Sequence, residues 1–322
     1  MSVQAYLFDA QSHDAQVRFE DHPPRTLTHR QLLWIHLQSP GQEELQRVGA
    51  FLDLSPNSQD ALEHSSRRPA LLHAGAYTHL HVLAAAERGG RYRTSPLHLI
   101  AGENYVLSVA QGPVSFLQDF EAHLQADTAL GELDSAAFLA ALLGRHVESY
   151  LLALDPLEEA IDGLDARTLT EPVGPELLAD LARLRGQVGD LCRLLTSHRR
   201  VYSALARPDF VAFVGDEPER HLRALAAEYE HTVDSLESAR SLVLGSFDLY
   251  TARATLRTND VVSVLTLATV ALGLLATLAG FLGTNFETGV FELGDRGFYG
   301  MLALGLLLVG GLVLVARRRR WW

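Results

Sequence analysis

The residues best placed for chemistry lie on one face of an uncharged apolar stretch near the C-terminal end of the chain. Small and hydroxyl-bearing side chains recur there every three or four residues, which puts them on one side of a helix. They are Ser263, Thr266, Thr269, Gly273, Thr277, Gly280 and Thr284. Such a stripe lets membrane helices approach closely, or it lines a water-filled path in which hydroxyl groups and glycine backbone face hydrated ions. Taken by itself, the stripe favours helix packing.

A short polar segment follows this stretch and offers oxygen ligands. Gly283-Thr284-Asn285 comes first, and the acids Glu287, Glu292 and Asp295 come after it. Amide and carboxylate oxygens are the ligands that hard divalent cations prefer. A ring of such segments would raise the local cation concentration, whereas acids in a single short loop are ordinary solvated charges. Both interpretations stay open.

Two apolar spans, 261–282 and 298–316, must position these residues, and neither span contains a charged side chain. About 20 apolar residues in a helix cross a hydrocarbon core of about 30 Å. We therefore expect a hairpin of two transmembrane helices in a lipid bilayer, with an external loop at 283–297.

Arginine residues flank the hairpin and predict its orientation. Arg253 and Arg257 precede the first span, and a basic tail at 317–322 follows the second. Basic flanks stay in the cytoplasm, so both termini are expected there, with the protein in the cell (inner) membrane. The N-terminal residues show no basic segment followed by an apolar run, so no cleaved signal peptide is expected.

Length and composition restrict the possible functions. The chain has 322 residues and a net charge of −12, which leaves room for a soluble domain and argues against a nucleic-acid partner. Its single cysteine, Cys192, permits no internal disulfide. The sequence shows no phosphate-binding loop, Cys-x-x-Cys pair or nucleophile elbow, so we expect no enzyme.

The order of the patterns predicts an α+β membrane protein. Residues 1–115 form the expected α/β cytosolic domain. Its helix is predicted at 42–52, and its strand-like runs lie at 4–8, 33–37, 77–83, 97–100 and 105–109.

The chain then becomes helical, over 116–216. There we expect a kink or restart at Pro156, a turn across 163–175 and one long helix along Leu177–Leu205. A short connection at 208–215 leads to a stalk, 217–260, that starts near Pro218 and continues into the first span as one helix of about 60 residues, roughly 90 Å long. Such a rod can carry a conformational change from the cytosolic domain to the membrane.

His79 and His81 lie two residues apart in a predicted strand and therefore point to the same face. Two imidazole groups could hold a transition metal. A third ligand is absent nearby in the sequence, so an ordinary surface pair is the favoured interpretation.

The loop and its surroundings resemble the CorA family of divalent-cation channels. Gly283-Thr284-Asn285-Phe286-Glu287 stands where that family has Gly-Met-Asn-Phe-Glu. Further matches are spread along the chain: Trp34-Ile35-His36-Leu37, Arg68-Pro69, Tyr229-Glu230-His231-Thr232, Asp248-Leu249-Tyr250, Asn259 with Val262 and Leu265-Thr266, and Ala279-Gly280. In this hairpin topology the resemblance is specific, and it covers essentially the whole chain.

The resemblance implies a homopentamer with five first-span helices around a pore. Gly283, Thr284 and Asn285 would form the selectivity filter at the outer mouth. The family's pore-lining positions fall on Asn259, Val262, Leu265, Thr266, Gly273, Ala276 and Gly280. Mg²⁺ is the implied main ion and the implied regulatory ion, with Co²⁺, Ni²⁺ or Zn²⁺ as further cations.

Three departures from the family pattern affect these expectations. Thr284 replaces the signature Met, and Leu274 and Ala276 stand where other members have Pro and Thr. In the stalk, Ala227 stands where the family pattern has a metal-ligating Asp, and Glu230 stands where it has a second Asp. The neighbouring Glu228 could replace the lost ligand, so Glu228 and Glu230 are the candidates for a regulatory metal site, and the alternative is that this site is absent or moved. A zinc transporter of the ZntB type and a non-conducting membrane-anchored scaffold or sensor remain the alternatives.

Overall fold

The computed structural model describes residues 3–9, 15–17, 27–28, 31–64, 66–124, 134–207, 216–283 and 294–318. The chain divides into two compact units. Unit 1 comprises Met1–Ala166 and Glu176–Ser246, and unit 2 comprises Arg167–Pro175 and Phe247–Trp322.

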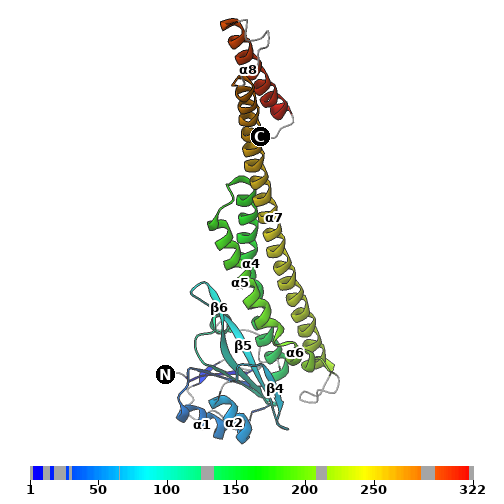
Figure 1. The fold of residues 1–322 in the computed structure, drawn as a ribbon. Helices are drawn as coiled ribbons and strands as arrows, with labels where there is room; N and C mark the ends of the chain where they lie inside the picture. Colours follow the sequence, from blue (N-terminus) through cyan, green and yellow to red (C-terminus); the bar gives the residue numbers. More distant parts are fainter. Residues whose placement is uncertain are drawn as a thin grey trace. The chain divides into compact units, whose positions relative to one another are not determined.

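Unit 1 contains a seven-stranded sheet (Figure 1). Its strands are β1 (Val3–Asp9), β2 (Ala15–Val17), β3 (Gln31–Gln38), β4 (Ala70–His73), β5 (Thr78–Arg88), β6 (Arg91–Ala101) and β7 (Tyr105–Ala110). The spatial order is β2-β1-β3-β7-β6-β5-β4. All neighbours are antiparallel except β3 and β7, which run parallel.

The β5–β6 hairpin turns through Gly89 and Gly90, both at positive φ (61° and 73°). A two-residue hairpin turn whose twist matches that of its strands needs this left-handed backbone at both positions, which glycine adopts without strain. Each strand of the hairpin has 11 residues.

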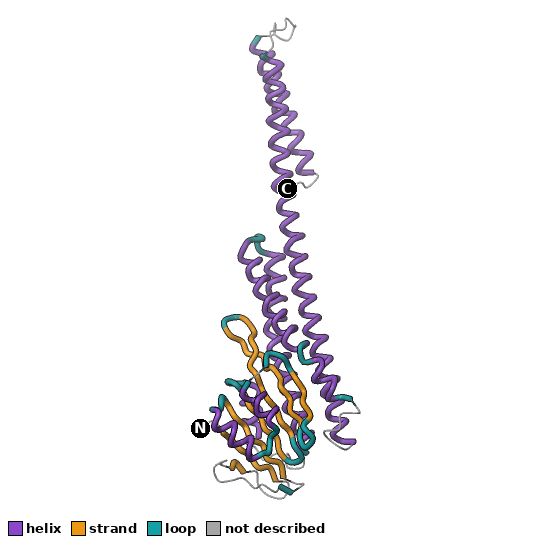
Figure 2. Tube along the Cα trace, turned by 60° about the horizontal axis from the view of Figure 1, so that its bottom comes forward, coloured by secondary structure: helices purple, strands orange, loops and turns teal. Residues whose placement is uncertain are grey.

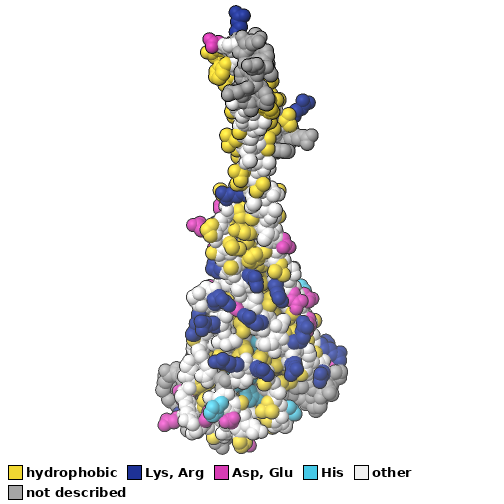
Figure 3. All heavy atoms as spheres, in the orientation of Figure 1, with side chains coloured by type: hydrophobic (Ala, Val, Ile, Leu, Met, Phe, Trp, Pro, Cys, Tyr) yellow, Lys and Arg dark blue, Asp and Glu magenta, His cyan; other side chains and the backbone are white. Residues whose placement is uncertain are grey.

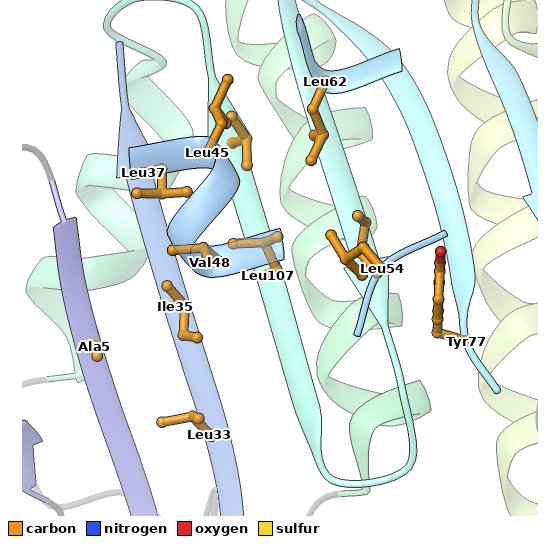
Figure 4. Packing of buried hydrophobic residues seen from close by; sticks show 12 residues of the cluster. Ala5, Leu33, Ile35, Leu37, Leu45, Val48, Leu54, Leu62, Tyr77 and Leu107 are labelled. Atoms are coloured by element: carbon orange, nitrogen blue, oxygen red, sulfur yellow. The ribbon is translucent and has the colours of Figure 1, made fainter. Parts of the chain in front are cut away.

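Alternate residues of β3 enter two different cores, because successive side chains of a strand point to opposite faces. On one face, Ile35 packs with Leu107 of β7 against Leu45 and Val48 of α1 (Gln42–Phe51) (Figure 4). Helix α2 (Pro56–Glu63) adds Leu62 to the same core.

On the other face of the sheet, Trp34 lies against Phe120 of α3 (Ser115–Leu124) and Phe138, with ring centroids 5.8 and 5.6 Å apart. The sheet is therefore covered on both faces.

Five further helices complete the described chain (Figure 2). They are α4 (Ser135–Thr170), α5 (Pro175–Thr196), α6 (Arg199–Leu205), α7 (Asp216–Leu282) and α8 (Asp295–Arg318). Helix α7 has 67 residues, so the expected continuous stalk and first span are one helix. The predicted connection at 208–215 lies outside the described residues.

Two sequence predictions for this region need correction, the turn across 163–175 and the single helix along Leu177–Leu205. Of the predicted kink or restart at Pro156, the restart does not occur. Helix α4 continues through Pro156 and past Gly163, and the turn to α5 contains only Glu171–Gly174. Proline removes the hydrogen bond to the carbonyl four residues earlier, here that of Leu152. Leu152 is 64% exposed, so water can take the place of that bond.

The predicted long helix along Leu177–Leu205 is two helices, α5 and α6, with a break at Ser197 and His198. Side chains at the break bind the Leu194 carbonyl, which would otherwise accept a backbone hydrogen bond of a continuing helix. Ser197 Oγ donates to this carbonyl at 2.7 Å, and His198 Nδ1 lies 2.8 Å from the same oxygen. The apolar positions were nevertheless correct, since Leu177, Leu181 and Tyr202 are all buried.

The sequence missed β2, β4 and α2. The two strands have three and four residues, too few to show a period. Helix α2 is defined by its start instead, where Ser55 Oγ accepts from the Ser58 amide and Pro56 begins the helix.

Candidate functional site

The membrane-type helices of unit 2 pack through one face of α7. Between residues 261 and 281, the less exposed positions of α7 recur every three or four residues: Ser263, Leu267, Ala271, Leu274 and Leu278. A Cβ atom at Gly305 of α8 would lie 3.4 Å from Leu278 Cδ1 and 3.6 Å from Leu275 Cδ2. The missing side chain of Gly305 thus lets α8 approach this face of α7.

The predicted pore-lining residues lie on a different face. All seven are exposed in the single chain: Asn259, Val262, Leu265, Thr266, Gly273, Ala276 and Gly280. Of the six small and hydroxyl residues of the stripe that the structure describes, only Ser263 lies on the half-buried side that α8 covers. Packing within the chain therefore does not account for the stripe, and its exposed face is available to other subunits or to water.

The threonine hydroxyls of this face are satisfied within the helix. Thr266, Thr269 and Thr277 each donate to the carbonyl four residues earlier at 2.8 Å. Each hydroxyl oxygen keeps acceptor capacity toward the exposed side. No acid or base occurs from 261 to 281, so this surface could face a cation only with neutral oxygens and apolar groups.

The filter residues lie at the edge of the described chain. The Gly283 amide donates to the carbonyls of Ala279 (3.0 Å) and Gly280 (3.2 Å), which ends α7. Thr284, Asn285, Glu287 and Glu292 lie outside the described residues. Asp295, expected in the loop, is the first residue of α8. The positive end of the helix dipole stabilises a carboxylate at this position.

Arg253 and Arg257 have a structural role that the sequence did not indicate. Both side chains bind the turn between α4 and α5 within unit 2. Arg253 donates to the carbonyls of Thr168 (3.3 Å) and Leu169, and Arg257 donates to that of Val173 at 2.9 Å. The last carbonyl groups of a helix are commonly bound by side chains, and the two arginines cap the end of α4 and the turn that follows in this way.

The candidate regulatory acids are not brought together. Glu228 and Glu230 are both exposed on α7, two residues apart and therefore on different sides of the helix. Glu230 pairs with Arg199 of α6 at 3.2 Å. Within the described ranges, no group of three or more His, Cys, Asp or Glu residues has a metal-holding arrangement.

His79 and His81 are buried, which corrects the expectation of a surface pair. They meet a third histidine, His98 of β6: His79 Nε2 lies 3.0 Å from His98 Nδ1, and the His81 and His98 rings stack at 4.4 Å. Burial lowers the pKa of His79 to about 4 and that of His98 to about 3. The sequence could have shown this cluster only through the strand pairing that places His98 opposite His81.

Three described helices are long and apolar enough to cross a membrane: Ser135–Thr170, Pro218–Phe281 and Asp295–Arg318. Half of the apolar window of the first is buried, against 0% and 6% for the other two. Helix α4 is therefore a core helix of unit 1. Figure 3 shows apolar side chains gathered over α8 and the last part of α7, with charged ones near the ends of that region.

Fold and site together define a helical membrane protein, in which a mixed α/β domain and a long helix precede an uncharged apolar hairpin. Residues 29–318 match the family described as CorA-like Mg²⁺ transporter protein, and the chain belongs to this family. The expected fold class, membrane location and non-enzymatic transporter class are thereby confirmed.

Two curated relatives have the same percentage identity to the chain. The cobalt/magnesium transport protein CorA of Thermotoga maritima is 23% identical over 295 residues, covering 89% of this chain and 83% of the relative. The zinc transport protein ZntB of Pectobacterium atrosepticum is also 23% identical, over 304 residues, covering 89% and 87%.

Two solved structures share the fold. The complete CorA magnesium transporter from Methanocaldococcus jannaschii has a TM-score of 0.80 at 17% identity, covering 100% of this chain and 99% of that one. The full-length CmaX protein has a TM-score of 0.74 at 20% identity, covering 96% and 97%.

Proposed function

We propose that this chain forms a homopentameric channel in the cell inner membrane that passes divalent cations, mainly Mg²⁺ and also Co²⁺ or Ni²⁺, into the cytoplasm. The exposed, uncharged face of α7 that α8 leaves free carries this proposal. Two spans in one chain cannot enclose a path, so a closed ring of identical subunits must supply the remaining walls. The first span is assigned to 261–282 and the second to 298–316, with both termini in the cytoplasm.

The ion would cross this path with water molecules still bound. Mg²⁺ loses its water reluctantly, and the path offers neutral oxygens in place of a carboxylate cage. Five Asn285 side chains would hold the hydrated ion at the outer mouth, with Gly283 and Thr284 beside them. An inside-negative potential drives a divalent ion inward by about 4.6 kcal/mol per 100 mV, so no ATP is needed.

An apolar constriction would close the path at its inner end. Val262 and Leu265 are 53% and 65% exposed in the single chain. A ring of five such side chains excludes water and therefore blocks a hydrated ion. Binding of a cytosolic cation near Glu228 or Glu230 would favour the closed state, with α7 carrying the change to the span.

Zinc transport is the second candidate. It is favoured by the ZntB relative, whose identity to the chain equals that of the CorA relative. Thr284 in place of the family Met supports it too, because a polar filter rim changes which hydrated ion is preferred.

Ion uptake into proteoliposomes, followed with Mg²⁺ and Zn²⁺ indicators, tests the proposal. Mg²⁺ influx that collapses in Asn285→Ala but persists in Ser263→Ala is the expected result, because Ser263 lies on the α8 side of the helix. Zn²⁺ flux with little Mg²⁺ flux would instead support the second candidate function, zinc transport. Absence of both fluxes from an assembled oligomer would leave a non-conducting scaffold.

A further inference from the structure

Unit 1 contains a cavity of about 740 Å³ between α5 and α7. Four arginines line it, Arg91, Arg185, Arg193 and Arg240, together with a single acid, Glu237. This concentration of positive charge is unusual in a chain whose net charge is −12. The volume falls within the range of small-molecule sites, about 300–1,000 Å³.

A buried acid holds part of this arginine cluster in place. The Asp190 side chain is 7% exposed. Arg91 donates two hydrogen bonds to its carboxylate, at 2.6 and 3.1 Å, and Arg193 also pairs with it. Hydrogen bonding from Arg91 lowers the pKa of Asp190, so the carboxylate is ionised. Arg91 uses two of its five N–H donors in this way, and the remaining donors stay available.

Two glycines of α5 shape the cavity. A Cβ atom at Gly186 would lie 3.6 Å from Arg91 Cζ, an ordinary van der Waals distance, so the guanidinium group of Arg91 lies beside the backbone of α5 here. Gly189, one turn further on, has no atom within 4 Å of such a Cβ. Glycine inside a helix costs about 1 kcal/mol relative to alanine. At Gly189 the helix carries this cost, and the missing side chain leaves open space on the lining of the cavity.

The lining also has an apolar part, where Leu244 is 51% exposed and the neighbouring Val188 and Val243 are almost fully buried. Guanidinium groups match phosphate oxygens in bidentate geometry, and apolar side chains favour a flat organic group. We propose that this cavity binds a nucleoside polyphosphate, with the phosphates on the arginines and the base against the apolar wall. This site is separate from the proposed ion path and does not depend on it.

The test is a calorimetric titration of the full-length protein in detergent with ATP, and with pyrophosphate and adenosine as its two halves. ATP should bind, pyrophosphate should bind more weakly and adenosine should show no measurable binding. If ATP does not bind, the proposal of a nucleotide site in this cavity is wrong. If pyrophosphate binds as tightly as ATP, the nucleoside part of the proposal is wrong.

Three variants locate the binding. Arg240→Gln should weaken ATP binding by about tenfold, because it removes one charge-assisted contact. Gly189→Leu should abolish binding by filling the open space, while it leaves every charge in place and improves the helix propensity of α5. Arg220→Gln, an exposed arginine of α7 outside the cavity lining, should leave binding unchanged.

Cys192 provides a second readout in the same cavity. It is the single cysteine of the chain, it lines the cavity and it is 7% exposed. Saturating ATP should slow its reaction with a maleimide by at least about threefold at alkaline pH. Unchanged labelling with ATP, or ATP affinity retained in Gly189→Leu, would contradict the proposed position.

Discussion

The backbone amide of Leu83 in β5 donates to Nε2 of His198, 115 residues later, at 2.8 Å. Strand β4 begins at Ala70, which pairs with His81, so Leu83 of β5 has no partner residue on the β4 side. The Leu83 carbonyl is also satisfied by side chains, His146 at 3.1 Å and Tyr150 at 2.9 Å. Side chains of α4 and of the α5–α6 break thus replace the missing strand.

This arrangement predicts that acid destabilises unit 1. Burial lowers the pKa of His146 to about 4 and that of His198 to about 3, below the ordinary value of 6.5. The unfolded chain therefore binds more protons, and stability that is complete above about pH 6.5 is lost as the pH falls toward 4. For His146 we expect a loss of about 2 kcal/mol at pH 4.5.

Thermal unfolding from pH 7.5 to pH 4.5 measures this loss. His198→Gln should lower stability at pH 7.5 and reduce the pH dependence, since one titrating group is gone. His64→Gln, on an exposed histidine, should leave the profile unchanged. A pH-independent melting temperature in the wild-type protein would contradict the neutral-histidine arrangement.

The arginine contacts to the α4–α5 turn predict a local effect in unit 2. Arg253→Gln should expose the carbonyls of Thr168 and Leu169 and destabilise the turn by about 1 kcal/mol. Hydrogen exchange at residues 168–174 should then accelerate about fivefold. Arg200→Gln, an exposed arginine of α6, is the matched control. Equal exchange in both variants would show that the contacts do not stabilise the turn.

The contact of Gly305 with α7 predicts a steric limit in the hairpin. Gly305→Val should push α8 away from Leu278 and Leu275 and cost about 1–3 kcal/mol. Gly310→Val is the matched control, because a Cβ there meets no atom within 4 Å. Thermal inactivation in detergent compares the two. A more stable Gly305→Val variant would overturn the close packing of the two helices.

The exposed face of α7 predicts which valine of the first span controls ion flow. Val262 and Val264 are two residues apart, hence about 200° apart on the helix, and are 53% and 49% exposed. Val262→Asn should hydrate the proposed constriction and raise Mg²⁺ flux severalfold at high cytosolic Mg²⁺. Val264→Asn should leave this closed-state flux unchanged. The opposite pattern would place the path on the other side of α7.

Much of the architecture is readable from the sequence because it depends on local composition. The uncharged runs at 261–282 and 298–316 predict the hairpin, and the absence of proline from Glu219 to Leu282 predicts one continuous helix. Strands β1, β3, β5, β6 and β7 follow from short apolar runs between turn residues. Helical spacing within the first span also shows the stripe of small and hydroxyl residues, whereas the candidate pore positions come from the resemblance to the CorA family.

Tertiary structure decided the features that join distant residues. His198, at the break between α5 and α6, meets Leu83 115 residues earlier, and Arg253 and Arg257 bind a turn 84 or 85 residues earlier. The arginine-lined cavity needs the tip of β6 next to α5. Periodicity reports which face of an element is buried, but it contains no information about which distant groups satisfy each other's hydrogen bonds and charges. Only the packed chain brings those groups within bonding distance.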